Sequence, residues 1–182
     1  GALIKNDLGT VYLEFVPRVK QGTLTIPENV DTIRNKAFYF TPFIEKVIIS
    51  GGLSKIAEQA FYDCEALKEI EFINEGTAPL TIEDGAFYGT PVLQVIKFPA
   101  RLASISVSSL NSIDSLKTVY VYDGGQYYGS TADGFLTNGA KDTLLYVPAS
   151  WKGDLVIPVG VTTIGEGAFN ECVNLKAITI PE

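Results

Sequence analysis

An internal repeat of about 23 residues constrains the fold of this chain more than any other feature. The pair Ala-Phe occurs four times along the 182 residues, and Leu110 takes the place of the phenylalanine in a fifth copy. In all five copies a large apolar residue stands five residues before this anchor and six, nine and eleven residues after it. The chain is therefore built from copies of one unit, whose anchors are Phe38, Phe61, Phe87, Leu110 and Phe169.

The spacing within a copy predicts one coil of a right-handed solenoid. In the last part of each copy an apolar residue stands at every second place, which is typical of a short strand with one buried face. The anchor lies among Gly, Asp, Asn and Glu, which suit a tight turn or a single helical turn. One coil cannot enclose its own apolar side chains, whereas stacked coils enclose a continuous core and align their strands in one parallel sheet. We therefore predict a mainly β fold with a buried column of the five anchors and strands at residues 46–49, 69–72, 95–98, 118–121 and 177–180.

The period is interrupted between Val121 and Leu155 by a turn-rich stretch and by two apolar runs around Asn138-Gly139. Apolar runs on either side of such a turn predict a β-hairpin. The same unit opens the chain 131 residues earlier, with its turn at residues 6–9. We therefore expect one domain over residues 1–182, made of a hairpin unit (1–22), repeats (23–122), a linker and hairpin insertion (123–154) and a further repeat (155–182).

The repeat resembles that of the BspA-like leucine-rich-repeat family, which reads roughly I-P-x-x-V-x-x-I-G-x-x-A-F-x-x-C-x-x-L-x-x-I-x. Residues 157–181, IPVGVTTIGEGAFNECVNLKAITIP, match this pattern almost place for place, and the resemblance covers essentially the whole chain. It is weaker where Ser109-Leu110 replaces Ala-Phe and where residues are inserted near Glu75 to Pro79. The asparagine ladder of ordinary leucine-rich repeats is missing, since its places hold Gly52, Glu75, Arg101 and Gly124.

The resemblance implies a leucine-rich-repeat solenoid with short helical turns and β-hairpin insertions. It also implies a location at the cell surface or outside the cell. The family occurs in secreted and surface-anchored proteins of gut and oral bacteria and in some protozoan parasites. Members are implicated in adhesion to host proteins and to other cells, so the resemblance implies a binding role that the residues alone do not show.

The composition disfavours several classes of function. A net charge of −7 argues against nucleic acid as a partner and against a polybasic membrane patch. Histidine is absent, which removes the commonest general base and the commonest zinc ligand. Glu69 and Glu71 alternate on the outer face of one predicted strand, so a carboxylate pair for glycoside hydrolysis would lack a cleft. We therefore expect no catalytic residue, no cofactor and no metal.

The two cysteines, Cys64 and Cys172, occupy equivalent places three residues after an anchor. Thr41 and Thr90 hold this place in two other copies, so a small residue is favoured there and we expect a crowded site between coils. At least three strand spacings separate the two cysteines, which is roughly 15 Å, whereas a disulfide requires Cα atoms within about 7 Å. We therefore expect both thiols to be reduced and buried.

The open face of the predicted sheet is the best candidate for a binding site. Its outward places lie eight and ten residues after each anchor, where aromatic and apolar side chains could hold a partner. The same residues also suit strands and could simply pack on one another. The candidate face comprises Lys46, Ile48, Glu69, Glu71, Val95, Lys97, Thr118, Tyr120 and Tyr122. In the insertion, by contrast, Tyr127, Tyr128 and Trp151 are interpreted as packing residues.

The sequence therefore favours a non-catalytic cell-surface or secreted adhesion module that recognises a protein or a glycan on a host or neighbouring cell. A structural spacer in a longer surface protein and the accessory repeat region of an enzyme are the alternatives. Neither nucleic-acid binding nor membrane insertion by this segment is expected. The chain has no methionine, and Pro181-Glu182 would begin a further coil in the family pattern. We therefore expect further repeats or another chain at the C-terminal edge.

Overall fold

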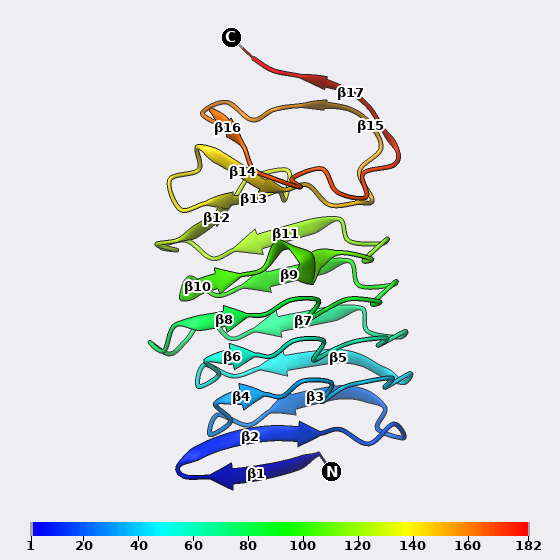
Figure 1. Cartoon of the computed structure of the whole chain (residues 1–182), viewed down its shortest axis with the longest axis vertical. Helices are drawn as coiled ribbons and strands as arrows, with labels where there is room; N and C mark the ends of the chain where they lie inside the picture. The colour runs from blue at the N-terminus through cyan, green and yellow to red at the C-terminus, as the bar shows by residue number, and fades with distance from the viewer. Residues whose placement is uncertain (1, 182) are drawn as a thin grey trace.

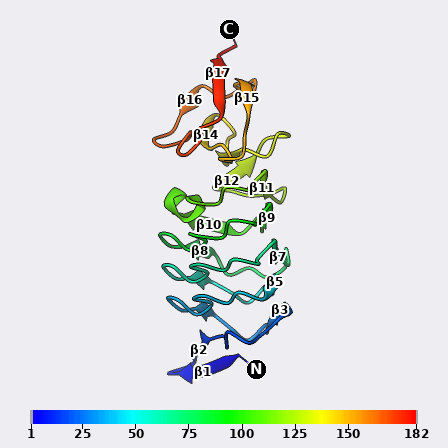
Figure 2. The same ribbon diagram turned by 90° about the vertical axis from the view of Figure 1, so that its right-hand side faces the viewer.

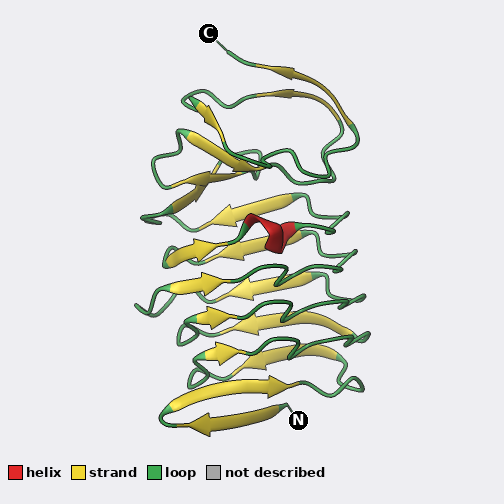
Figure 3. Ribbon diagram, in the orientation of Figure 1, coloured by secondary structure: helices red, strands yellow, loops and turns green. Residues whose placement is uncertain are grey.

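The computed structural model describes residues 2–181 and shows an elongated stack of coils, with the two ends of the chain at opposite ends of the stack (Figure 1). Nearly all of its regular structure is β (Figure 3). Within the described residues, the one helical segment is a single 3₁₀ turn at Val107–Leu110. The prediction of a mainly β solenoid of stacked parallel coils is therefore confirmed.

The longer strands of the coils form a five-stranded parallel sheet in the order β11-β9-β7-β5-β3. Equivalent residues of successive coils lie opposite one another, so that Ile70 of one coil has Val47 on one side and Ile96 on the other. Four of these strands correspond to strands predicted from the alternation of the repeat. The strands are β3 (Gly22–Ile26), β5 (Ile44–Ile49), β7 (Glu69–Phe72), β9 (Val95–Phe98) and β11 (Thr118–Val121).

The fifth predicted strand does not join this sheet. It is β17 (Leu175–Thr179), and it pairs in parallel with β15 (Gly153–Val156) in a separate two-stranded sheet. The free edge of β11 is instead covered by the insertion, where the Val119 N–H donates a hydrogen bond of 2.9 Å to the carbonyl oxygen of Gly134. The expectation that all five strands share one sheet is wrong for β17, because the insertion occupies the edge that β15 would need.

A second sheet of shorter strands lies across each coil from the first (Figure 2). Its parallel strands contain the buried isoleucines that stand five residues before the anchors. The sequence predicts a buried residue at this place but no strand, because two to four residues show too little alternation. The strands, in spatial order, are β1 (Leu3–Asp7), β2 (Thr10–Phe15), β4 (Thr32–Ile33), β6 (Lys55–Ile56), β8 (Leu80–Ile82) and β10 (Leu102–Ile105).

Two antiparallel hairpins occupy the places that the sequence predicts. β1 and β2 pair around the turn at residues 6–9, and the second hairpin turns after Asn138, whose side-chain oxygen accepts a 3.1 Å hydrogen bond from the Asp142 N–H. In each unit the second hairpin strand then pairs in parallel with a short strand of the following coil. The strands of the second unit are β12 (Tyr128–Ser130), β13 (Leu136–Asn138), β14 (Thr143–Tyr146) and β16 (Thr163–Ile164).

The predicted anchor column is present in the first part of the stack. Phe38 and Phe61 stack with ring centroids 4.3 Å apart, Phe61 and Phe87 with centroids 5.5 Å apart, and Leu110 continues the column fully buried. Phe169 does not join it, because the insertion lies between the two coils. It is only partly buried and packs in a second apolar cluster that contains Phe135, Leu144, Val147, Leu155, Ile157 and Ala168.

One buried tyrosine from the insertion closes the end of the first core. Tyr146 belongs to the same apolar cluster as the anchor column, and its hydroxyl donates a 3.1 Å hydrogen bond to the carbonyl oxygen of Leu110. The last described coil is more open than the others. Ile164, Ile178 and Ile180, which occupy core places in the repeat, are 43%, 41% and 69% exposed.

The small-residue place three residues after the anchor is crowded, as the sequence predicts. Thr41, Cys64 and Thr90 are fully buried. Both cysteines are free thiols, and burial raises the pKa of the Cys64 thiol to about 11. Cys172 departs from the prediction, because it lies in the open last coil and is only partly buried. Burial still raises the pKa of its thiol above the ordinary value.

The side chain of Arg101 donates hydrogen bonds to backbone carbonyl groups of neighbouring coils, at one of the places where the asparagine ladder is missing. Its Nη1 donates to the carbonyl oxygens of Leu53 and Ala78, at 2.5 and 2.8 Å, and its Nε donates to that of Glu75 at 3.2 Å. These acceptors lie on two preceding coils, so one side chain ties three coils together. Partial burial lowers the pKa of this guanidinium.

Candidate binding surface

The register of the five-stranded sheet assembles eight residues of the candidate face in two rows. In the first row, Lys46 lies opposite Glu69, Glu69 opposite Val95, and Val95 opposite Thr118. In the second row Ile48, Glu71, Lys97 and Tyr120 follow one another in the same way. Tyr122 follows directly after β11. The structure therefore brings the predicted residues onto one face of adjacent strands.

Charged side chains on this face form ion pairs at the end formed by β5 and β7. The Nζ of Lys46 lies 3.2 Å from an oxygen of Glu69 and 2.6 Å from an oxygen of Glu71. The hydrogen bond that Lys46 donates to the carboxylate of Glu71 raises the pKa of the Lys46 ammonium. Because all three side chains remain partly exposed, solvent screens these ion pairs and they stabilise the fold little. One ammonium between two carboxylates leaves this end of the face with a net charge of −1.

The opposite end of the face is aromatic. Tyr120 and Tyr122 meet edge to face, with ring centroids 5.4 Å apart and planes at 84°. Tyr120 is 36% exposed, and Lys97 lies beside it in the next strand, with its side chain also exposed. Ile48 and Val95 are partly buried and so less exposed than the sequence suggests. Tyrosine is enriched at protein interfaces, so this aromatic end is the part of the face best suited to a contact.

The tyrosines and the tryptophan of the insertion differ in role. Tyr128 and Trp151 pack as predicted: the Tyr128 hydroxyl accepts a 3.3 Å hydrogen bond from the Ile105 N–H, and the Trp151 ring meets Phe135 edge to face at 5.1 Å. Tyr127 was expected to pack too, but its side chain is 53% exposed. It lies just outside strand β12, and its side chain does not share the partly buried position of Tyr128.

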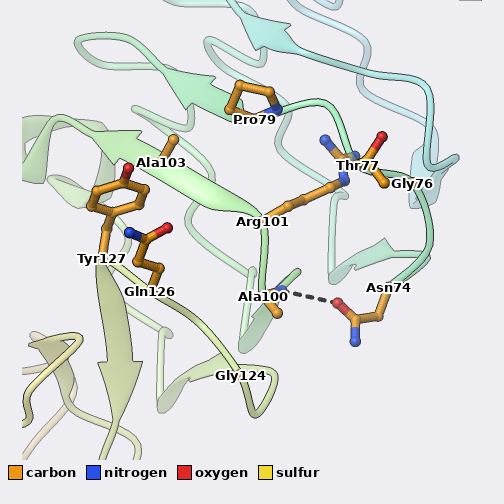
Figure 4. A pocket seen from close by; sticks show the side chains of 10 residues that line it. All are labelled: Asn74, Gly76, Thr77, Pro79, Ala100, Arg101, Ala103, Gly124, Gln126 and Tyr127. Atoms are coloured by element: carbon orange, nitrogen blue, oxygen red, sulfur yellow. Dashed lines mark hydrogen bonds between the residues drawn. The ribbon is translucent and has the colours of Figure 1, made fainter.

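A hollow of about 430 Å³ lies on the turn edge of the stack, and the sequence analysis did not predict it (Figure 4). Its lining side chains come from residues 74–79, 100–103 and 124–127. We call it the edge hollow. Two of these segments are departures from the repeat: the insertion near Glu75 and the start of the interruption after Val121. These departures are visible in the sequence and are the signal that could have located the hollow.

A second unpredicted feature is a ladder of three tyrosines, each directly after an anchor phenylalanine. The rings of Tyr39 and Tyr62 lie 5.8 Å apart, and those of Tyr62 and Tyr88 lie 5.4 Å apart and nearly parallel. The guanidinium of Arg18 lies 5.7 Å from the ring of Tyr39 at one end of the ladder. The repetition of tyrosine at this place is visible in the sequence, but it predicts stacking only once the coil spacing is known.

The described residues contain little that points to other kinds of site. Within residues 2–181, no group of three or more cysteine, aspartate and glutamate side chains is placed to hold a metal ion. Over the same residues, no helix has the length and apolar character needed to cross a membrane. The arrangement of side chains on the sheet and in the edge hollow is suited to non-covalent contacts with a partner.

Comparisons with solved structures agree on the fold. The pneumococcal vaccine antigen PcpA superposes with a TM-score of 0.64 at 17% identity, over 99% of this chain and 68% of that one. A leucine-rich repeat protein from Eubacterium ventriosum gives 0.60 at 17% identity, over 96% of this chain and 56% of that one. The leucine-rich repeat protein of T. pallidum gives 0.53 at 14% identity, over 98% and 78%. The chain thus spans little more than half of the Eubacterium ventriosum protein.

Sequence comparison identifies the family directly. A search of curated proteins gave no match. The model of the BspA type leucine rich repeat region, however, matches six copies over residues 18–117 and 153–182. These residues are well over half of the chain and include all five anchors. The chain therefore belongs to the BspA-type leucine-rich-repeat family.

Proposed function

We propose that this chain is a non-catalytic binding module of a secreted or cell-surface protein, which recognises a protein or glycan on a host or neighbouring cell. The observation that carries the proposal is the aromatic end of the open sheet, where Tyr120 and Tyr122 are presented beside Lys97 without a covering element. The likeness to a vaccine antigen supports a location at the cell surface. Further repeats or another chain at the open last coil are part of the same proposal.

The contact residues follow from the chemistry of the face. Large aromatic side chains lose little conformational freedom on binding and supply most of the energy in a few contacts, whereas paired rim charges supply little. We therefore assign the main contact to Tyr120, whose ring is held in place by Tyr122. The ion-paired side chains of Lys46, Glu69 and Glu71 lie at the periphery of the contact.

The test uses a fluorescently labelled chain and cultured epithelial cells, with binding measured by flow cytometry. Tyr120→Ala is expected to weaken binding at least about tenfold, as hot-spot residues do. Tyr88→Ala is the matched control, because Tyr88 is 39% exposed but lies outside the sheet face. The control is expected to bind like the unchanged chain. Equal binding by both variants, or no binding by the unchanged chain, would overturn the proposal.

Treatment of the cells then identifies the partner class. Loss of binding after mild protease treatment indicates a protein partner, and loss after periodate oxidation of the cell surface indicates a glycan. Either result supports the proposed function.

A further inference from the structure

The edge hollow exists because two departures from the repeat meet at one edge of the stack. The insertion near Glu75 lengthens one coil, so that its anchor follows the previous one by 26 residues instead of 23. The interruption after Val121 brings residues 124–127 to the other side of the hollow, with residues 100–103 between them (Figure 4). Irregular segments inserted into a repeat commonly carry its binding function.

Two glycines shape the rim of the hollow. Gly76 and Gly124 have φ angles of +86° and +89°, in the left-handed region where other residues are strained. A Cβ at Gly76 would also collide with the backbone of Gly51. The tight turns at these two places therefore depend on glycine, and they leave the space between the segments open.

Most polar groups of the hollow are uncharged. Its one charged lining side chain is Arg101, whose Nε and Nη1 donate to three carbonyl oxygens and whose buried Nη2 has no hydrogen-bond partner among the described residues. The side-chain oxygen of Asn74 accepts a 2.9 Å hydrogen bond from the Ala100 N–H, which fixes the carboxamide at the rim. Asn74, Thr77 and Gln126 are exposed, and together they offer hydroxyl and amide groups that both donate and accept.

An aromatic ring completes the lining. Tyr127 is 53% exposed, and among the described residues its ring has no aromatic or cationic partner, unlike the tyrosines of the ladder. Its carbonyl oxygen accepts a 2.8 Å hydrogen bond from the Gly139 N–H, which anchors its backbone to the insertion. A ring held at the rim with a free face can cover an apolar surface of a ligand.

We propose that the edge hollow binds one unit of a neutral sugar chain. A pyranose combines hydroxyl groups around its edge with an apolar C–H face, which match the amide and hydroxyl groups and the free ring. Cations are disfavoured, because the one charged lining side chain, Arg101, is itself positive and the lining holds no carboxylate. An anionic sugar is the competing ligand, and the test below includes one. An apolar ligand would leave the polar groups unpaired. The volume of about 430 Å³ lies in the range of small-ligand pockets.

The test is saturation-transfer NMR on the whole chain with four probes: glucose, galactose, mannose and N-acetylglucosamine. We expect transfer to the ring protons of at least one probe, with a Kd of roughly millimolar for a single sugar unit. Tyr127→Ala is expected to lower the transfer at least fivefold, and Tyr127→Phe to retain it, since the ring rather than the hydroxyl covers the sugar. Gln126→Ala is expected to weaken it, and Tyr120→Ala, on the sheet face, to leave it unchanged.

Several results of this experiment would contradict sugar binding in the edge hollow. Absence of transfer to all four sugars would overturn the proposal, as would transfer that Tyr127→Ala leaves intact. Equal transfer to N-acetylneuraminic acid or to cyclohexanol would show that charge or apolar area, not neutral sugar chemistry, governs binding, and would also overturn it. Because cell binding through the sheet depends on Tyr120 and sugar binding on Tyr127, failure of one proposal leaves the other standing.

Discussion

At the scale of single residues, the small side chains behind the anchors are more than space fillers. The hydroxyl of Thr41 donates to the carbonyl oxygen of Phe38 at 3.0 Å, and that of Thr90 donates to the carbonyl oxygen of Phe87 at 2.7 Å. The thiol of Cys64 donates to the same carbonyl of Phe38 at 3.2 Å. Buried carbonyl groups need donors, so threonine and cysteine alternate here because both are small and both donate.

The buried thiol makes stability depend on pH in the alkaline range. The pKa of Cys64 is about 11 in the folded chain against an ordinary value of 9.0, because burial disfavours the thiolate. Between these values the unfolded chain releases the proton and the folded chain keeps it. The free energy of unfolding is therefore expected to fall by roughly 1 kcal/mol for each pH unit in this window, with the full contribution present below it. Urea denaturation at several pH values measures the slope.

Cys64→Thr is the matched variant for this slope, because Thr41 and Thr90 show that the place accepts threonine. The variant keeps the other groups that titrate in the alkaline range, including Tyr146, whose pKa burial also raises. We expect the free energy of unfolding of Cys64→Thr to fall less steeply with pH than that of the unchanged chain in the same pH window. Identical slopes would show that the Cys64 thiol is not the cause.

At the scale of elements, the anchor column stabilises the stack through buried, stacked rings. Phe61 is fully buried between Phe38 and Phe87. Phe61→Ala is expected to lower the free energy of unfolding by about 3–5 kcal/mol, from lost burial and the cavity left behind. Tyr62→Ala removes a neighbouring ring that is partly exposed, and is expected to cost under about 1 kcal/mol. Urea denaturation compares the two, and a loss below about 1 kcal/mol for Phe61→Ala would contradict the role of the column.

The elements that sequence predicts well are those whose pattern is local. β5, β7, β9 and β11 follow from alternation within one copy, and the outward rows of the candidate face follow from the same register. The separation of β17 from these strands could not be predicted, because its own residues repeat the pattern faithfully and its neighbours are set by the insertion. The edge hollow was missed for a related reason: Asn74 and Tyr127 are brought together only when separate irregular segments fold onto one edge.

At the scale of the whole molecule, two apolar clusters are joined at the insertion. Besides the apolar packing of Tyr146 in the first cluster, polar contacts cross the joint: the Ser150 hydroxyl donates to the carbonyl oxygen of Leu116 at 2.5 Å, and the Ser112 N–H donates to a carboxylate oxygen of Glu171 at 2.6 Å. The second cluster is smaller and its last coil is open. In a repeat stack each coil is stabilised mainly by its neighbours, so the two parts differ in local stability.

Native-state hydrogen exchange measures this difference. The amides of β5, β7 and β9 are expected to exchange only with global unfolding, whereas those of β15 and β17 exchange by local opening, at least about tenfold faster. Leu155→Ala, in the second cluster, should speed exchange in β15 and β17 and leave β7 unchanged. Uniform protection along the chain would show instead that the stack opens as one cooperative unit.

The contact between Trp151 and Phe135 gives the molecule an internal optical probe. Trp151 is the one tryptophan of the chain, and its ring belongs to the second cluster. Its emission wavelength therefore reports on hydration of that part alone. The tyrosine ladder lies against the first part, where its nearly parallel rings at Tyr62 and Tyr88 contribute to the near-ultraviolet circular dichroism signal. The difference between the spectra of the unchanged chain and of Tyr62→Ala isolates that contribution. Following this difference and the Trp151 emission on heating thus follows the two parts of the solenoid separately.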